Sequence, residues 1–414
     1  MSPLVIAAVW LALGLVSSAV LRRRTARLVA LVPLVGVGLT LLVTRSSTAA
    51  VPLGGLTGIT GLDRTGEGVL VAAGISMALV VLFQPSIDVS VGRAVGVVGA
   101  AATVAMASSD PLVTALALTA AVATLVLRWI GQSPGKATLA AGRVAGTGTA
   151  ALIAASPFLP LTGFTTGARP VVVGVLLATG VAALLAVYPL GGWAAGVIGA
   201  LKPAEIAPWL VLLVPVVLII AERIPGGNLG GGTPVYEHVL LVVGLGSAVW
   251  GGLWAVRGRT AMRYGRVFMV DIALCAAAVE GASVSPAVTG AMIILLTHLT
   301  LAPILLRSED AGLRWPRRVA WALLSGVPPS PAFWGRLLIL EALAAGNVGS
   351  TIAAVIAMGA IFIAAVMACS TTVRVFPEQR WRTRLPDLAA WMLIAIGVAV
   401  GLAPQSLAGF VFGH

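Results

Sequence analysis

The 414 residues are 59% hydrophobic and only 10% charged, and their mean hydropathy is +1.05. Soluble globular domains carry about a quarter charged residues, so this chain cannot cover a surface that faces water, and its solvent must be lipid. The net charge of +12 does not indicate a nucleic-acid partner, because the basic residues stand in short loops between apolar runs and not in a stripe interleaved with aromatic residues.

Apolar runs between charged or Pro/Gly-rich breaks predict an all-α polytopic membrane protein with about fourteen transmembrane helices, forming one integral membrane domain over residues 1–414. The first run has no basic segment before it and three arginines after it, so we interpret it as an uncleaved span. In chain order the predicted spans are 3–21, 28–44, 67–84, 93–108, 111–127, 140–160, 170–190, 205–222, 236–256, 267–284, 286–306, 319–345, 348–373 and 389–412.

The distribution of basic residues predicts the orientation. If the N-terminus is outside, 21 of the 26 Lys and Arg residues fall in cytoplasmic loops, Arg336 falls inside a span, and only Arg45, Arg64, Arg169 and Arg223 fall in outside loops. This asymmetry is what the positive-inside rule requires. The Ala-, Gly- and Arg-rich composition favours a high-GC bacterial source. We therefore expect a multi-pass protein of the bacterial cytoplasmic membrane, with its N- and C-termini outside.

Two predicted spans, the seventh and the twelfth, are interrupted by proline and glycine. The seventh ends in YPLGGW with Pro189, and the twelfth contains SGVPPSPAFWGR with Pro328 and Pro329. Proline removes a helix N–H, and in lipid the freed backbone groups must find partners within the protein or in a hydrated cavity. Broken helices five spans apart predict two inverted five-helix repeats, at about 93–222 and 236–373, with an ion path near each break. A pair of packing kinks is the alternative.

Four ionisable residues of the predicted spans are the candidate functional residues, because a charge at membrane depth usually marks function. His298, in span 11, is interpreted either as a hydrogen-bonded packing residue or as part of a proton relay, since imidazole gains and loses a proton near neutral pH. Arg336, in span 12 just past the break, favours a functional or pairing role. Asp271 and Glu341 are candidate counter-ions, although their positions near predicted span ends favour hydrated helix termini. Cys275 and Cys369 match no metal or redox spacing, and no cofactor-binding motif is present.

Four segments of the chain resemble the antiporter-like membrane subunits of respiratory complex I, of multisubunit cation/proton antiporters and of membrane-bound hydrogenases. The most specific is SGVPPSPAFWGR, which is similar to the family's LAGIPPxxGFxGKF. The segments lie at 61–64, at 108–114, at 188–193 with 203–208, and at 296–299 with 325–336. The resemblance covers most of the chain, and it also implies fourteen spans, an outside N-terminus and broken helices 7 and 12.

The resemblance further implies a chain of buried charges across the membrane, which this sequence has largely lost. The family's Glu of span 5 falls near Thr119 or Ala120, and its Lys residues of spans 7, 8 and 11 fall at Leu184, near Pro215 and at Ala302. Only His298 and Arg336, the latter at the span-12 Lys/Glu position, keep ionisable side chains. The chain is therefore a divergent member in which neither carboxylate–lysine pair can form.

These observations predict a subunit of an ion-translocating assembly, similar to NADH:quinone oxidoreductase or a membrane hydrogenase. It would be at most a non-catalytic subunit that contacts other membrane subunits and the lipid bilayer, with a degenerate proton path formed by His298 and Arg336. It would bind no cofactor or metal itself. Two alternatives stay open: a stand-alone secondary transporter with a solute site at the broken helices, and an active pump that uses His298 and Arg336.

Overall fold

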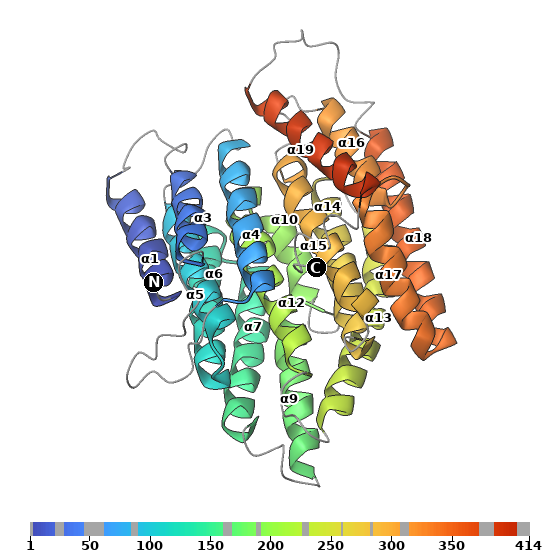
Figure 1. The fold of residues 1–414 in the computed structure, drawn as a ribbon, viewed down its shortest axis with the longest axis horizontal. Coiled ribbons are helices and arrows are strands. Elements are labelled where there is room, and N and C mark those ends of the chain that lie inside the picture. The colour runs from blue at the N-terminus through green and yellow to red at the C-terminus, as the bar shows by residue number, and fades with distance from the viewer. Residues whose placement is uncertain are drawn as a thin grey trace. The chain divides into compact units, whose positions relative to one another are not determined.

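The computed structural model describes residues 3–20, 29–44, 62–83, 90–159, 168–187, 192–225, 232–257, 260–281, 285–306, 314–371 and 385–403. Within these ranges every element of regular structure is helical. The chain divides into two compact units, Met1–Ala186 with Leu190–Leu240 (unit 1) and Val187–Pro189 with Leu241–His414 (unit 2). In each unit the helices lie side by side as a bundle (Figure 1).

Unit 1 is built from the N-terminal helices. α1 packs against α5, α3 against α4, and α6, α7 and α9 pack in succession. Its elements are α1 (Pro3–Val20), α3 (Leu31–Thr44), α4 (Arg64–Phe83), α5 (Ser90–Ala107), α6 (Pro111–Gln132), α7 (Lys136–Ala155), η1 (Ser156–Phe158), α9 (Ala168–Leu184), α10 (Gly192–Ala200), α11 (Pro203–Ala207), η2 (Pro208–Leu213), α12 (Val214–Arg223) and the start of α13 (Thr233–Arg257).

Unit 2 holds the rest of α13 and the C-terminal helices. α15 packs against α17, α16 against α18, and α14 against both α15 and α18. Its further elements are α14 (Thr260–Ala277), η4 (Ala278–Gly281), α15 (Ser285–Leu305), α16 (Arg314–Ser325), α17 (Pro331–Gly346), α18 (Val348–Thr371) and α19 (Leu385–Leu402).

Helices coincide with each of the predicted spans, and the chain is a multi-pass membrane protein by their length and composition. Within the described residues, seven helices are long and apolar enough to cross a membrane: Thr65–Phe83, Ser90–Ala107, Pro111–Gln132, Pro203–Arg223, Thr233–Arg257, Pro286–Leu305 and Val348–Cys369. Shorter apolar helices, Leu4–Val16, Arg169–Leu184 and Leu388–Leu402, add to these. That all the predicted spans cross the bilayer, and that the two five-helix segments are inverted repeats, remain predictions.

Both predicted helix breaks fall where regular helix stops. The twelfth predicted span is divided into α16, which ends at Ser325, and α17, which begins at Pro331. Between them Pro328 and Pro329 are exposed and joined by a cis peptide bond. In the seventh span α9 ends at Leu184 and α10 begins at Gly192. Pro189, named as the centre of that break, lies outside the described residues.

The eighth predicted span, expected as one continuous helix over 205–222, contains a change of helix type. α11 passes directly into η2, a π-helical turn over Pro208–Leu213, before α12 continues the segment. Pro208 and Pro215 stand at this interruption, and a proline lacks the N–H that a regular ladder would use at those positions. A π-helical turn widens the helix and rotates the side chains around it, so it changes which residues of this span face its neighbours.

The contact between α15 and α17 is close enough to need glycine on both sides. A Cβ atom on Gly335 would lie 2.7 Å from Cγ1 of Ile294 and 2.9 Å from the carbonyl oxygen of Gly290. A Cβ atom on Gly290 would in turn lie 2.7 Å from the carbonyl oxygen of Gly335. Small residues allow helix backbones to approach in a membrane, where lipid supplies no hydrophobic drive for association. This approach sets the spacing between His298 on α15 and Arg336 on α17.

We expect Gly335→Ala to reduce the free energy of unfolding by about 1–3 kcal/mol, because the added methyl group meets backbone atoms that cannot move independently. Thermal unfolding of the purified protein in detergent measures the change. Gly346→Ala, in the same helix, is the matched control, because a Cβ atom there meets nothing within 4 Å. Equal stability of the two variants would contradict the close approach of α15 and α17.

Candidate functional site

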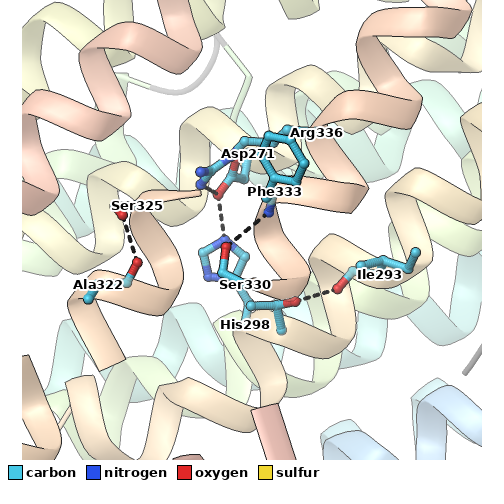
Figure 2. Close-up of polar contacts among 9 residues, drawn as sticks. Asp271, Ile293, His298, Ala322, Ser325, Ser330, Phe333 and Arg336 are labelled. Carbon is cyan, nitrogen blue, oxygen red and sulfur yellow. Dashed lines mark hydrogen bonds and ion pairs between the residues drawn. The ribbon is translucent and has the colours of Figure 1, made fainter. Parts of the chain in front are cut away.

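Three ionisable side chains meet inside unit 2. The guanidinium of Arg336 donates two hydrogen bonds to the carboxylate of Asp271, from Nε to Oδ1 at 2.9 Å and from Nη2 to Oδ2 at 2.8 Å. Nε2 of His298 lies 2.8 Å from Oδ2 of the same carboxylate (Figure 2). Asp271 is 0%, His298 1% and Arg336 4% exposed. The three residues form a buried charge cluster, in which Asp271 is the common partner.

Three helices supply the cluster. Asp271 stands on α14 on the same face as Tyr264 and Phe268, because residues three and four apart share one side of a helix. These two aromatic rings enclose His298, with ring centroids 4.8 Å away for Phe268 and 5.9 Å away for Tyr264. The hydroxyl of Tyr264 also donates to the carbonyl oxygen of His298 at 3.4 Å. The imidazole is therefore held in place by ring contacts and by the carboxylate together.

The broken helix places the guanidinium. Ser330 is the N-cap of α17, and its hydroxyl accepts a hydrogen bond from the backbone N–H of Phe333 at 3.2 Å (Figure 2). Gly326 has φ +85°, a conformation that side chains with a Cβ rarely adopt. A Cβ atom on Gly326 would lie 2.7 Å from Nη1 of Arg336. The turn between α16 and α17 thus leaves room for the guanidinium only because residue 326 is glycine.

The contact with Asp271 shows which ring nitrogen of His298 carries a proton. An ionised carboxylate only accepts hydrogen bonds, so Nε2 of His298 carries a proton and donates it to Asp271. In the neutral imidazole Nδ1 then has a free lone pair. Nδ1 is buried and has no hydrogen-bond partner among the described residues. His298 therefore offers one proton-accepting atom, whereas Arg336 offers none, because guanidinium keeps its proton at any physiological pH.

The favoured interpretation of Asp271 as a hydrated helix terminus is wrong. The predicted span begins at residue 267, whereas α14 begins at Thr260, so Asp271 lies well inside the helix and is fully buried. From their charges, Arg263 and Arg266 are predicted to lie in a loop. Both residues instead belong to α14, and Arg263 is only 5% exposed. Glu341, the other candidate counter-ion, is exposed on α17, and the carboxylate that meets Arg336 is that of Asp271.

Apolar or neutral groups occupy the positions at which the family resemblance implies further charges. In unit 1 the hydroxyl of Thr119 donates to the carbonyl oxygen of Ala115 at 2.7 Å, within its own helix. Ala120 is exposed, Leu184 is 1% exposed, and Pro215 is buried in α12. In unit 2, Ala302 is 2% exposed.

Two ion pairs in unit 1 are not predictable from the sequence. Arg128 forms a bidentate contact with Glu205, with Nη2 2.7 Å from Oε1, and donates from Nη1 to Ser90. Arg223 pairs with Asp63 and donates to the carbonyl oxygen of Met106 at 2.9 Å. The partners are far apart in sequence, and no local spacing connects them. From the distribution of basic residues, Arg128 and Arg223 are both predicted to lie in loops.

Solved structures share the fold of this chain over nearly its full length. A chain of the membrane-bound sulfane sulfur reductase, an archaeal respiratory membrane complex, matches with TM-score 0.83 and 15% identity, covering 98% of this chain and 96% of that one. A chain of respiratory complex I from Thermus thermophilus matches with TM-score 0.78 and 17% identity, covering 97% of both chains. A chain of the Mrp complex from Dietzia sp. matches with TM-score 0.83 and 15% identity, covering 98% of this chain but only 51% of that longer one.

The chain therefore has the fold of membrane subunits from multisubunit complexes, which confirms at the level of the fold the antiporter-like resemblance drawn from the sequence. No family model and no curated protein matches the sequence. Identities of 15–17% leave the side chains of this chain as the only guide to its chemistry.

Removing the carboxylate of Asp271 should leave the buried guanidinium of Arg336 without a counter-charge. We expect Asp271→Asn to lower the free energy of unfolding by about 3–5 kcal/mol, measured by thermal unfolding in detergent. Asp271→Asn combined with Arg336→Gln should recover much of this loss, since no unpaired charge then remains buried. Glu341→Gln, the same kind of change at an exposed position, is the control and should stay within about 0.5 kcal/mol. A single variant as stable as this control would contradict the buried ion pair.

Gly326→Ala should destabilise the protein by about 1–2 kcal/mol from its backbone conformation alone, and further through the contact with Arg336. Gly359→Ala in α18 is the comparison, because its Cβ would meet nothing within 4 Å and alanine favours helix. Differential scanning fluorimetry of the two variants tests this. A gain in stability in Gly326→Ala would show that the turn does not require a positive φ.

Proposed function

We propose that this chain is an antiporter-like membrane subunit of a multisubunit ion-translocating oxidoreductase of the complex I or membrane-hydrogenase kind, and that it performs a structural and coupling role without translocating protons. It resides in a bacterial cytoplasmic membrane with both termini outside. Its shared fold with membrane subunits of respiratory and Mrp complexes supports the assembly. The distribution of its basic residues supports the orientation.

The observation that carries the proposal is the bidentate pairing of Arg336 with Asp271. A proton relay needs groups that gain and lose a proton as it passes. Arg336 stands where the resemblance implies a lysine or glutamate, but guanidinium does not release its proton, and its charge is already neutralised by Asp271. The pair stabilises the fold at the helix break and cannot pass a proton onward.

Unit 1 supplies no substitute for the missing relay at the implied positions. Thr119, Leu184 and Pro215 occupy the positions of the implied charges, and the hydroxyl of Thr119 is bonded within its own helix. The ion pairs of unit 1, Arg128 with Glu205 and Arg223 with Asp63, involve other residues. A proton entering this unit would therefore have no titratable side chain at those positions to receive it.

His298 is the residual element of the path. Its Nδ1 can accept one proton, while its Nε2 remains bonded to Asp271. The imidazole lies against the charged Asp271–Arg336 pair, so a change in the charge around the pair would act directly on His298. This is the coupling role that we assign to the cluster, with His298 as the responsive group and Arg336 as the fixed charge.

We expect proteoliposomes of the purified chain to show no proton flux above protein-free liposomes, measured with a trapped pH-sensitive dye under an imposed potential. His298→Ala and Arg336→Ala should leave this baseline unchanged. Flux in the wild type that either substitution abolishes would contradict the proposal and support an active pump instead.

Affinity purification of the tagged chain from its native membrane, in mild detergent, tests the assembly. We expect further membrane subunits and redox subunits of one complex to be retained in constant ratio. A chain that purifies alone as a monomer or homo-oligomer and binds a solute would support the stand-alone transporter and overturn the subunit assignment.

A further inference from the structure

Three tryptophan side chains meet inside unit 1. Trp129 lies on α6, Trp193 on α10 and Trp209 on the π-helical turn η2. Their ring centroids are 6.1 Å apart for Trp129 with Trp193, 6.1 Å for Trp129 with Trp209, and 5.0 Å for Trp193 with Trp209. All three are buried, at 1%, 5% and 2% exposure respectively. α10 follows the break after α9, and η2 is itself an irregular turn, so the cluster lies at the irregular part of unit 1.

The tryptophans line a small pocket together with aliphatic side chains. Leu184, at the end of α9, lines it as well, and the other lining residues are Val122, Leu125, Val126, Ala145 and Leu213. The only polar side-chain groups in this set are indole N–H groups. A buried water molecule needs about 2–4 polar partners. The lining therefore disfavours water.

The available indole N–H groups do not change this conclusion. Nε1 of Trp129 already donates to the carbonyl oxygen of Glu205 at 3.0 Å. Nε1 of Trp193 is buried and has no hydrogen-bond partner among the described residues. An indole N–H only donates, so without acceptor groups in the lining these groups cannot hold a chain of water molecules, and a proton crosses an apolar space only along such a chain.

Neighbouring contacts fix the cluster in place. Glu205, whose carbonyl oxygen binds Trp129, is also the ion partner of Arg128, the residue before Trp129. The same arginine donates to Ser90 at the start of α5. This network ties α5, α6 and α11 together beside the three rings. The rings are consequently held by an ion pair on one side and by aliphatic packing on the other.

We infer that Trp129, Trp193, Trp209 and Leu184 form a dry seal in unit 1 that excludes water, and with it protons and ions, from the space beside the end of α9. The inference rests on the proposed function and deepens it: the protein has not only lost titratable groups but also has a hydrophobic barrier at this position. Hydrophobic constrictions block ions because water leaves them.

Thiol labelling tests whether the region is dry. Leu184→Cys is introduced into the full-length chain after Cys275→Ala and Cys369→Ala, and membranes are treated with a charged methanethiosulfonate reagent, which reacts only with a hydrated thiolate. We expect labelling roughly tenfold or more slower than at Lys136→Cys, an exposed position at the start of α7. Labelling of the two positions at equal rates would overturn the seal.

A second experiment removes two of the tryptophan side chains that form the seal. Trp193→Ala with Trp209→Ala should raise the labelling rate of Leu184→Cys roughly tenfold and should raise the proton leak of proteoliposomes above that of the wild type. Trp321→Ala, which removes a buried tryptophan of unit 2, should change neither. An unchanged labelling rate in the double variant would contradict the role of the tryptophans.

The two proposals fail separately. Proton flux through the wild type contradicts the proposed function. A wild type without flux, combined with a Leu184→Cys variant whose thiol reacts at the rate of the exposed position, contradicts the seal alone. Slow labelling of Leu184→Cys with all three tryptophans in place supports the seal even if the double tryptophan variant does not fold.

Discussion

Burying a charge in a low-dielectric interior requires a counter-charge and hydrogen bonds at close range, and unit 2 meets this requirement with the pairing of Arg336 and Asp271. The guanidinium contacts both carboxylate oxygens, and the remaining capacity of Oδ2 is used by His298. Breaking such a pair leaves an uncompensated charge, which costs more than the pair itself contributes. The helix break, the glycine at position 326 and the close approach of α15 and α17 all serve to bring these three side chains within hydrogen-bond distance.

The two units place their charges differently. In unit 1 the ion pairs of Arg128 with Glu205 and of Arg223 with Asp63 join residues at or near helix ends, while the side chains around Leu184 are apolar and aromatic. In unit 2 the charges meet within helices α14, α15 and α17. At the positions where the resemblance implies charges, unit 1 holds Thr119, Leu184 and Pro215, whereas unit 2 keeps His298 with its buried Nδ1. In these proposals unit 2 contains the responsive group, His298, and unit 1 contains the dry seal that excludes water and protons.

Interrupted helices contribute to both arrangements. Between α16 and α17 the chain changes direction at Gly326 and restarts at the N-cap Ser330, which brings Arg336 near Asp271. In unit 1 the π-helical turn over Pro208–Leu213 carries Trp209 to its contacts with Trp129 and Trp193. Irregular backbone is expensive in a membrane unless neighbouring groups satisfy it. Irregular backbone lies beside both the charge cluster and the three tryptophans, and in each place it positions a side chain of the site, Arg336 or Trp209.

The sequence by itself determined the medium, the helical class and the place of most helices, because hydropathy and charge act along the chain and need no knowledge of the fold. Breaks near Pro189 and Pro328 were predictable for the same reason, since proline acts on its own helix. The partners of charged residues were not. The charges of Arg263 and Arg266 resemble those of a loop and so suggest a hydrated helix end at Asp271, and Arg128 gives no sign of its contact with Glu205. Only the tertiary structure decided these pairings, because they join residues 65 and 77 positions apart through packing that no local pattern records.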